Sequence, residues 1–78
     1  MSIEQRLKKL LSDCVGIDTA QIKLTDHLVT DLGMDSLDLV EIVMDIENEF
    51  KIQIEPAEAD LASTVSLIID LIKSKTKE

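Results

Sequence analysis

The stretch that decides the fold is residues 31–50, which read DLGMDSLDLVEIVMDIENEF. Its apolar residues recur at helical spacing, so we expect a helix from about Ser36 to Glu49. Asp35 is a good N-cap for this helix, and Asp38, three residues on, is a variant of the capping-box acid. A cap of this kind is worth roughly 1 kcal/mol. The stretch therefore predicts a helix that presents the Ser36 hydroxyl on its first turn.

The predicted helix has two apolar faces. At roughly 100° per residue, the residues that must face the core are Leu39, Ile42, Val43, Ile46 and Phe50. A third arc, nearly opposite, holds Leu37, Val40 and Met44. These three side chains either pack under a loop or another helix, or form an exposed strip that docks a partner with an apolar groove and a basic rim. A helix that served only a core would not need this second stripe, which favours docking.

The negative charge of the chain lies on the segment around Ser36. Residues 24–50 contain eight acids and no Lys or Arg, whereas the rest holds eight acids and eight bases, giving a formal net charge of -8. The pairs Glu41–Asp45 and Asp45–Glu49 place like charges four residues apart, which costs a few tenths of a kcal/mol each. Such a charge argues against nucleic acid and anionic membranes and favours basic partners. The uncompensated acids indicate a recognition surface.

Helical spacing is also present before this stretch. Ser2 is a plausible N-cap and Gly16 a plausible C-terminal stop for a first helix. Residues 17–35 then form a long connection. Its expected apolar anchors are Ile22, Leu24, Leu28, Val29 and Leu32. A helical turn near His27–Asp31 fits the pattern, and for the only histidine we favour a surface or loop-capping role.

The C-terminal part predicts two more helices. A short one begins at Pro56, and the last one starts after the Ser63-Thr64 cap and runs to about Ser74. The residues of the last helix expected toward the core are Val65, Ile68, Ile69 and Ile72, with Leu67 and Leu71 beside them. Its C-terminal cations, which the helix dipole favours, are Lys73, Lys75 and Lys77. We expect one all-α domain over residues 1–78, a small four-helix bundle of three main helices and one short helix with a long first loop.

Catalytic and metal-binding motifs are absent from the sequence. Residues 34–38 lack both glycines of a G-x-S-x-G elbow, and His27 has no second His or Cys with which to share a metal. No calcium loop or P-loop matches. Cys14 has no disulfide partner and is expected to be a small core residue. An enzyme is therefore disfavoured and no metal site is expected. Ser36 is instead placed to be modified, since a helix N-terminus favours an attached phosphate.

Residues 31–44 resemble the attachment motif and second helix of acyl carrier proteins, with D-L-G-x-D-S-L-D followed by an acidic, two-faced helix. The segments at the spacing of that family's other elements are Met1–Val15, Glu49-Phe50, Ile54 and Ser63-Thr64-Val65. The resemblance implies that Ser36 carries phosphopantetheine, transferred from coenzyme A by a magnesium-dependent holo-carrier synthase. It also implies that the thiol of that arm holds acyl groups as thioesters.

The resemblance implies roles for the surrounding residues as well. Asp35 and Asp38 would engage basic residues or the metal of the synthase. The surface that docks acyl-synthesis enzymes through their basic patches would comprise Leu37, Val40, Glu41, Met44 and Glu47. The pocket that shelters an acyl chain would be lined by Leu39, Ile46, Phe50, Ile54, Val65 and Ile68.

Pathway, location and oligomeric state are further expectations. The N-terminus lacks a signal-peptide core, and no apolar run approaches the roughly 20 residues that span a bilayer, so we expect a cytoplasmic monomer without a membrane span. Fatty-acid biosynthesis is the expected pathway. Lys51, Leu61 and Ala62 depart from the acidic pattern common in fatty-acid members, which leaves a specialised carrier open. A carrier of aminoacyl or polyketide units and an unmodified helical interaction module are the alternatives.

Overall fold

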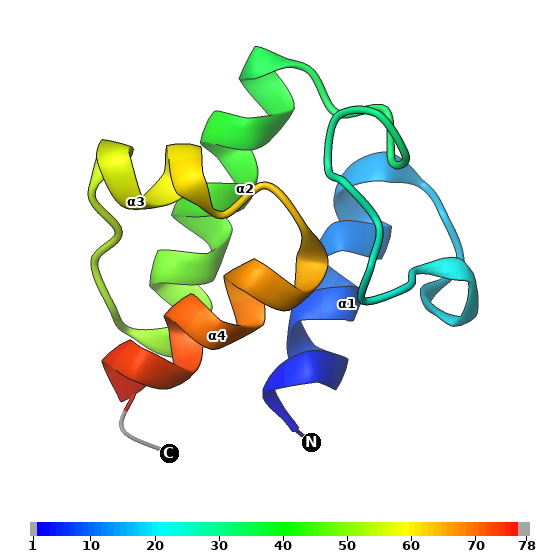
Figure 1. Ribbon diagram of the computed structural model, residues 1–78. Coiled ribbons are helices and arrows are strands. Elements are labelled where there is room, and N and C mark those ends of the chain that lie inside the picture. Colours follow the sequence, from blue (N-terminus) through cyan, green and yellow to red (C-terminus); the bar gives the residue numbers. More distant parts are fainter. Residues whose placement is uncertain (1, 77–78) are drawn as a thin grey trace.

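The computed structural model describes residues 2–76 as a bundle of helices (Figure 1). In chain order the elements are α1 (Ile3–Val15), the 3-10 helix η1 (Thr19–Gln21), α2 (Ser36–Phe50), α3 (Pro56–Leu61) and α4 (Val65–Thr76). Within the described residues no strand forms, and an isolated antiparallel bridge joins His27 to Thr64. The expected all-α bundle of three main helices and one short helix is confirmed. Lys77, expected near the end of the last helix, lies outside the described residues.

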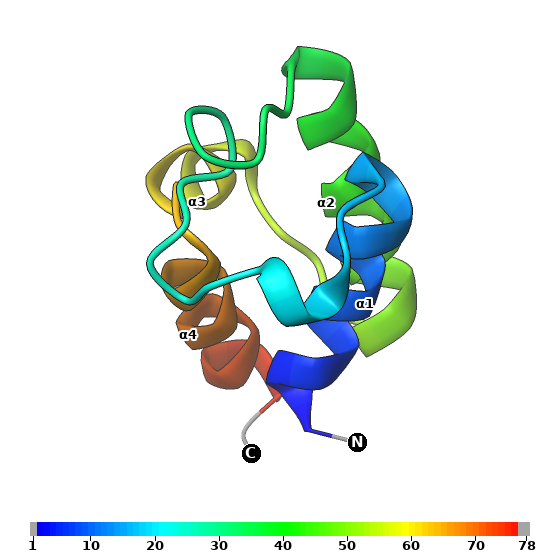
Figure 2. The same cartoon turned by 90° about the vertical axis from the view of Figure 1, so that its right-hand side faces the viewer.

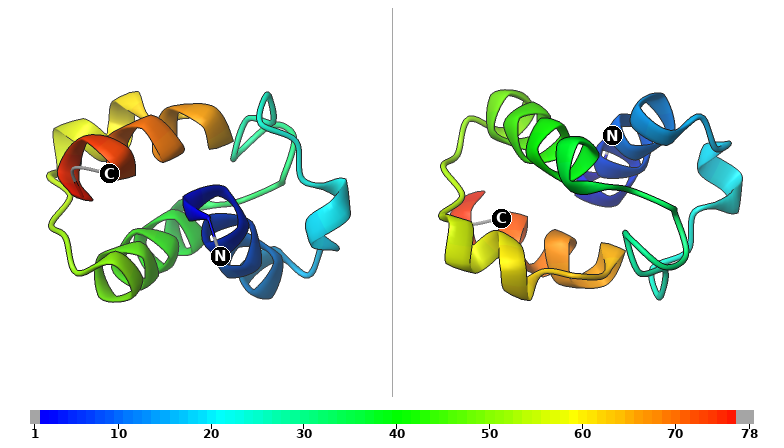
Figure 3. Two further views of the ribbon diagram at one scale, coloured as in Figure 1. Left: turned by 90° about the horizontal axis from the view of Figure 1, so that it is seen from below. Right: turned by 90° about the horizontal axis from the view of Figure 1, so that it is seen from above.

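The four α-helices form two layers (Figure 3). α1 and α2 lie in one layer, and α3 and α4 lie in the other. The connection over residues 17–35 passes from one layer to the other at one end of the bundle (Figure 3). Figure 2 views the molecule from the side on which this connection runs. In Figure 1 the first turn of α1 and the last turn of α4 lie at the lower end, whereas the first turn of α2 lies at the upper end. Ser36 is therefore presented at the end of the molecule farthest from these two turns.

The core between the layers is aliphatic apart from one aromatic ring. Its buried side chains are Ile3, Leu7, Leu11, Ile22, Leu28, Leu32, Met34, Ile42, Ile46, Phe50, Ala62, Val65, Ile68, Ile69 and Ile72. All four residues of α4 that were expected to face the core are among them, and Leu67 beside them is exposed. On α2, Leu39 and Val43 are half-buried rather than buried. Burial of a Leu, Ile or Val side chain stabilises the fold by about 1.5–3 kcal/mol.

Local hydrogen bonds set both ends of α1, as the sequence predicts. The Ser2 hydroxyl accepts from the Gln5 N–H at 3.1 Å, and the Gln5 side-chain oxygen accepts from the Ser2 N–H at 3.0 Å. At the other end Gly16 has φ 74° and donates its N–H to the Ser12 carbonyl at 2.8 Å. A left-handed residue at this position is typically glycine, because glycine has no Cβ to clash.

One arginine of α1 joins the two helices of its layer. The Arg6 Nε donates to the Glu49 carboxylate and the Nη2 to the Glu49 carbonyl, both at 2.9 Å. The guanidinium also lies 4.3 Å from the centroid of the Phe50 ring, which is cation–π distance. The sequence alone indicated that no basic residue compensates the acidic face of α2. The structure corrects this prediction for one residue. Glu49 has a basic partner from α1.

The 17–35 connection is held by buried side chains and by backbone bonds to α4. Three of its expected anchors, Ile22, Leu28 and Leu32, are buried. Leu24 and Val29 are exposed, so those two expectations are wrong. The Leu24 carbonyl instead accepts from the Ser66 N–H at 3.0 Å, and the Asp26 carbonyl accepts from the Val65 N–H at 3.1 Å. The connection thus satisfies N–H groups in the first turn of α4, where no intrahelical acceptor exists.

His27 organises the turn that precedes α2. Its Nδ1 accepts from the N–H groups of Val29 at 3.1 Å and Thr30 at 3.3 Å. The Asp31 N–H donates to the His27 carbonyl at 2.9 Å, and the Asp31 carboxylate accepts from the His27 N–H at 2.6 Å. The expected helical turn near His27–Asp31 is therefore a single hydrogen-bonded turn, and the loop-capping role of His27 is confirmed. The separate helix η1 was not expected.

Candidate functional site

The exposure of Ser36 follows from the residues immediately before it. Gly33 has φ 73°, which lets the chain turn sharply. Met34 then inserts into the core, with only 2% of its surface exposed, and its N–H donates to the Leu28 carbonyl at 3.0 Å. The apolar pattern of the connection did not predict Met34 as an anchor. Because the chain leaves the core directly after it, Ser36 emerges as an exposed residue at the start of α2.

The two aspartates around Ser36 cap the helix that carries it. The Asp35 carboxylate accepts from the Asp38 N–H at 2.9 Å, and the Asp38 carboxylate accepts from the Asp35 N–H at 3.3 Å. This reciprocal pair confirms the predicted capping box. Each carboxylate uses one oxygen in the pair, which leaves its other oxygen for further contacts. Ser36 is thus held between two carboxylates at the positive end of the α2 dipole.

Beyond Ser36, α2 presents an exposed apolar strip, which we define as Leu37, Val40 and Met44. Their exposed fractions are 79%, 60% and 55%. The alternative that these side chains pack under a loop or another helix is therefore wrong. Glu41, which lies between Val40 and Met44 in sequence, is exposed as well. The strip has the composition of a contact surface, with apolar side chains next to a carboxylate.

Glu47 differs from the other acids that were expected to dock partners. It is half-buried, and its carboxylate accepts from the Ile54 N–H at 2.8 Å. This bond holds the segment between α2 and α3 against α2. Glu47 therefore has a role within the chain, which sequence spacing alone did not indicate because Ile54 is seven residues away.

The acids of α2 also act across the layer on Cys14 of α1. Burial raises the pKa of the Cys14 thiol, and the negative charges of Asp38, Glu41 and Asp45 raise it further. A thiol with a raised pKa stays protonated near neutral pH and is a poor nucleophile. Cys14 packs against the core as a half-buried residue, in agreement with its expected structural role.

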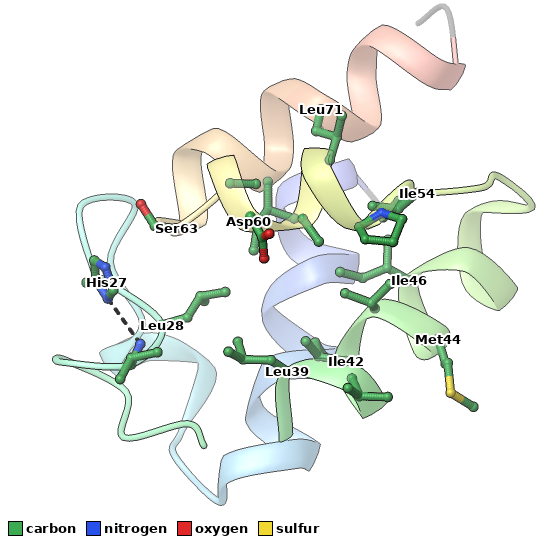
Figure 4. Close-up of a pocket in the computed structure, with 17 residues that line it drawn as sticks. His27, Leu28, Leu39, Ile42, Met44, Ile46, Ile54, Asp60, Ser63 and Leu71 are labelled. Carbon is green, nitrogen blue, oxygen red and sulfur yellow. Dashed lines mark hydrogen bonds between the residues drawn. The ribbon is translucent and has the colours of Figure 1, made fainter. Parts of the chain in front are cut away.

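A cavity of about 540 Å³ lies between α2 and α3 (Figure 4). Four of the residues expected to line a pocket do so, namely Leu39, Ile46, Ile54 and Ile68. Phe50 and Val65 do not line it. Both are buried elsewhere in the core, Phe50 beneath the Arg6 guanidinium. Helical spacing placed both on the correct face of their helices, but whether a residue faces a void depends on where α3 lies.

Several lining residues were missed or given another role by the sequence. α3 and its C-cap contribute Pro56, Ala59 and Ala62, which recur every three residues and so share one side. That spacing was the available signal. Val40 and Met44 of the apolar strip also border the cavity, so the strip and the cavity mouth are continuous. The polar or charged residues of the lining are His27, Asp60 and Ser63.

Metal-binding clusters and membrane-spanning helices are both absent from the part of the chain that the structure describes. Among residues 2–76, no cluster of three or more His, Cys, Asp or Glu side chains is arranged to hold a metal ion. None of the helices in this part of the chain has the length and apolar character needed to cross a bilayer.

Comparisons with known proteins identify what this arrangement is similar to. Residues 5–72 match a family model described as a phosphopantetheine attachment site, a range that includes Ser36 and the whole cavity lining. The chain is also 39% identical over 74 residues to the acyl carrier protein of Clostridium acetobutylicum. That match covers 95% of this chain and 96% of the relative. Both similarities extend over nearly all of the bundle.

Proposed function

We propose that Ser36 holds the phosphopantetheine arm of this chain, which belongs to the family of acyl carrier proteins. A member of this family is a carrier and not an enzyme, and phosphopantetheine is its cofactor. The observation that carries the assignment to Ser36 is its position as an exposed serine on the first turn of α2. Free N–H groups and the dipole at a helix N-terminus favour a phosphate there.

Attachment requires a separate transferase. The Ser36 Oγ forms a bond to phosphorus, the phosphoanhydride of coenzyme A breaks, and adenosine 3′,5′-bisphosphate leaves with the electron pair. The hydroxyl proton goes to a base on the transferase, since the only histidine of this chain uses its Nδ1 to hold the 27–30 turn. When bound, the arm supplies a thiol that holds acyl groups as thioesters. We propose that Asp35 and Asp38 contact the basic residues or metal of the holo-carrier synthase through their remaining oxygens.

Partner enzymes of acyl synthesis are proposed to dock on the apolar strip and Glu41. An apolar strip beside a carboxylate complements a groove with a basic rim, and the net charge of -8 steers such partners toward the carrier. The Glu47 carboxylate already accepts a hydrogen bond from the Ile54 N–H. Glu47 therefore adds negative charge to this surface but is not proposed to bind a partner directly.

The cavity is proposed to shelter the carried acyl chain. Leu39, Ile46, Ile54 and Ile68 present aliphatic surface to it, and each methylene removed from water there gains about 0.8 kcal/mol. Phe50 and Val65 would support this lining from the core behind it. A mostly apolar cavity favours fatty acyl groups over aminoacyl units. We therefore propose a carrier for fatty-acid or related acyl synthesis.

The exposed Ser36 hydroxyl also disfavours an unmodified interaction module, since the capping bonds of α2 are made by its neighbours Asp35 and Asp38. The single domain over residues 1–78, the monomeric state and the cytoplasmic location stay predictions.

The first experiment is intact-mass analysis after incubation with coenzyme A, Mg²⁺ and a broad-specificity phosphopantetheinyl transferase. We expect the wild type to gain one arm and Ser36→Ala to gain none. Ser74→Ala is the matched control, because Ser74 is also an exposed serine but lies in the last turns of α4. If the wild type gains no mass, or Ser36→Ala gains as much as Ser74→Ala, the proposal is wrong.

A further inference from the structure

The two walls of the cavity differ in the size of their side chains. α2 contributes long aliphatic residues, including Leu39, Ile42 and Ile46. Opposite α2 lie α4, through Ile68 and Leu71, and α3 with its C-cap. At Ala59 of α3 and at the C-cap Ala62, the lining side chains are single methyl groups. The three-residue spacing places both alanines on one side, Ala59 within α3 and Ala62 at its C-cap. Ala62 is 8% exposed and Ala59 is half-buried. Neither alanine is therefore a fully exposed surface residue.

Leaving a void at these positions costs stability. Protein interiors are normally close-packed, and a void deprives its lining atoms of dispersion contacts. A larger apolar residue at Ala59 or Ala62 would fill part of the space without changing the helix, because the φ and ψ of Ala62, −89° and 70°, are not in the left-handed region. The small residues therefore keep open a space that packing alone would close.

The cavity also has a direction. Leu39, three residues after Ser36, is the α2 lining residue nearest to it in sequence, and in Figure 4 Leu71 lies on the opposite side of the labelled lining. A chain tethered at Ser36 would enter from the Leu39 end and pass between α2 and α3. The volume of about 540 Å³ is about eighteen times the roughly 30 Å³ that one water takes up in the liquid, so the cavity holds at most about eighteen non-hydrogen atoms.

We propose that Ala59 and Ala62 set the length of acyl chain that this carrier shelters. This inference rests on the proposed function, because it requires a chain tethered at Ser36. A leucine at either alanine adds three carbon atoms to the α3 wall, and these occupy the space of part of the cargo. The sheltered length should therefore shorten by about three carbons.

The test compares carriers loaded with saturated acyl groups from acetyl to docosanoyl. Wild type, Ala62→Leu, Ala59→Leu and Ala57→Leu are each loaded, checked by intact mass, and melted. Ala57 is the matched control because it lies on the same helix but is exposed and does not line the cavity. For the wild type we expect stability to rise by about fourfold in the folding equilibrium constant per added methylene, until the cavity is full.

The decisive quantity is the acyl-chain length beyond which the stability of the loaded carrier no longer rises. We expect it about three carbons earlier in Ala62→Leu and Ala59→Leu than in Ala57→Leu, which should match the wild type. Ala62→Val, which adds two carbons, serves if Ala62→Leu does not fold, and should move the stop by about two. Equal stops in the cavity variants and Ala57→Leu, or a wild type whose melting ignores chain length, would overturn the inference. Failure to load the wild type would instead overturn the proposed function.

Discussion

At the scale of single residues, Lys51 adopts a conformation that its side chain disfavours. It ends α2 with φ 56° and ψ 49°, while its N–H donates to the Glu47 carbonyl. A left-handed conformation costs a residue with a Cβ roughly 1–2 kcal/mol, and glycine avoids that cost. Gly16 ends α1 in the same left-handed region without this penalty. The strain at Lys51 was not predictable from the pattern of residues, because that pattern placed the end of the helix only approximately.

Lys51→Gly should therefore stabilise the fold by about 0.5–1 kcal/mol, which is the relief of strain less the greater backbone entropy of glycine in the unfolded chain. Urea denaturation measures the change. Lys9→Gly is the matched control, since Lys9 is an exposed lysine inside α1, and it should destabilise by about 1 kcal/mol. A loss of stability in both variants would contradict this account of the α2 terminus.

At the scale of elements, α2 was predictable and the 17–35 connection was only partly so. The caps and apolar faces of α2 depend on residues that are three and four positions apart, so they can be predicted from a single sequence. The position of Leu24 instead involves a hydrogen bond that the distant Ser66 N–H donates to its carbonyl, and the Glu47 carboxylate accepts from the Ile54 N–H. The position of α3 determines which core residues face the cavity, which is why Ala59 and Ala62 were missed while Leu39 and Ile46 were found.

The α2 cap allows helix stability and transferase recognition to be separated at Asp35. Asn caps a helix about as well as Asp, so Asp35→Asn should change stability by only a few tenths of a kcal/mol, whereas Asp35→Ala should cost about 1 kcal/mol. If Asp35 also binds the holo-carrier synthase, the Asn variant should accept the arm several-fold more slowly. Asp18→Asn is the control, because Asp18 caps η1 through the Ala20 N–H at 3.0 Å. Equal transfer rates for the two Asn variants would exclude a recognition role for the Asp35 charge.

At the scale of the whole molecule, charge and packing are divided between regions. The acids concentrate in residues 24–50, which include the whole of α2, while bases on other elements form ion pairs such as Arg6–Glu49 and Lys75–Glu58. The hydrogen bond from the Glu55 N–H, and next that from Lys75, lower the pKa of the Glu58 carboxyl. The Lys75–Glu58 ion pair joins α3 to the end of α4. The surface around Ser36 thus keeps most of its negative field. This distribution was visible in the sequence, whereas the cavity required the assembled layers.

Glu41→Lys should slow association with the holo-carrier synthase by about tenfold at low salt, with a change in stability below about 0.5 kcal/mol. Stopped-flow kinetics at two ionic strengths measure the association rate and how far salt reduces the difference between the variants. Exposed charges are screened beyond about 10 Å at 0.1 M. Asp70→Lys is the control, because Asp70 is an exposed acid on α4 in the other layer. Equal slowing by both variants would indicate net charge rather than a docking surface.

The most direct test of the central claim is to locate the arm on the chain. The carrier is isolated from cells or loaded in vitro, digested, and sequenced by tandem mass spectrometry. We predict that phosphopantetheine is found on Ser36, the exposed serine between the capping carboxylates of Asp35 and Asp38. An arm on any other residue, or an unmodified Ser36 after complete reaction with a competent transferase, would contradict the account.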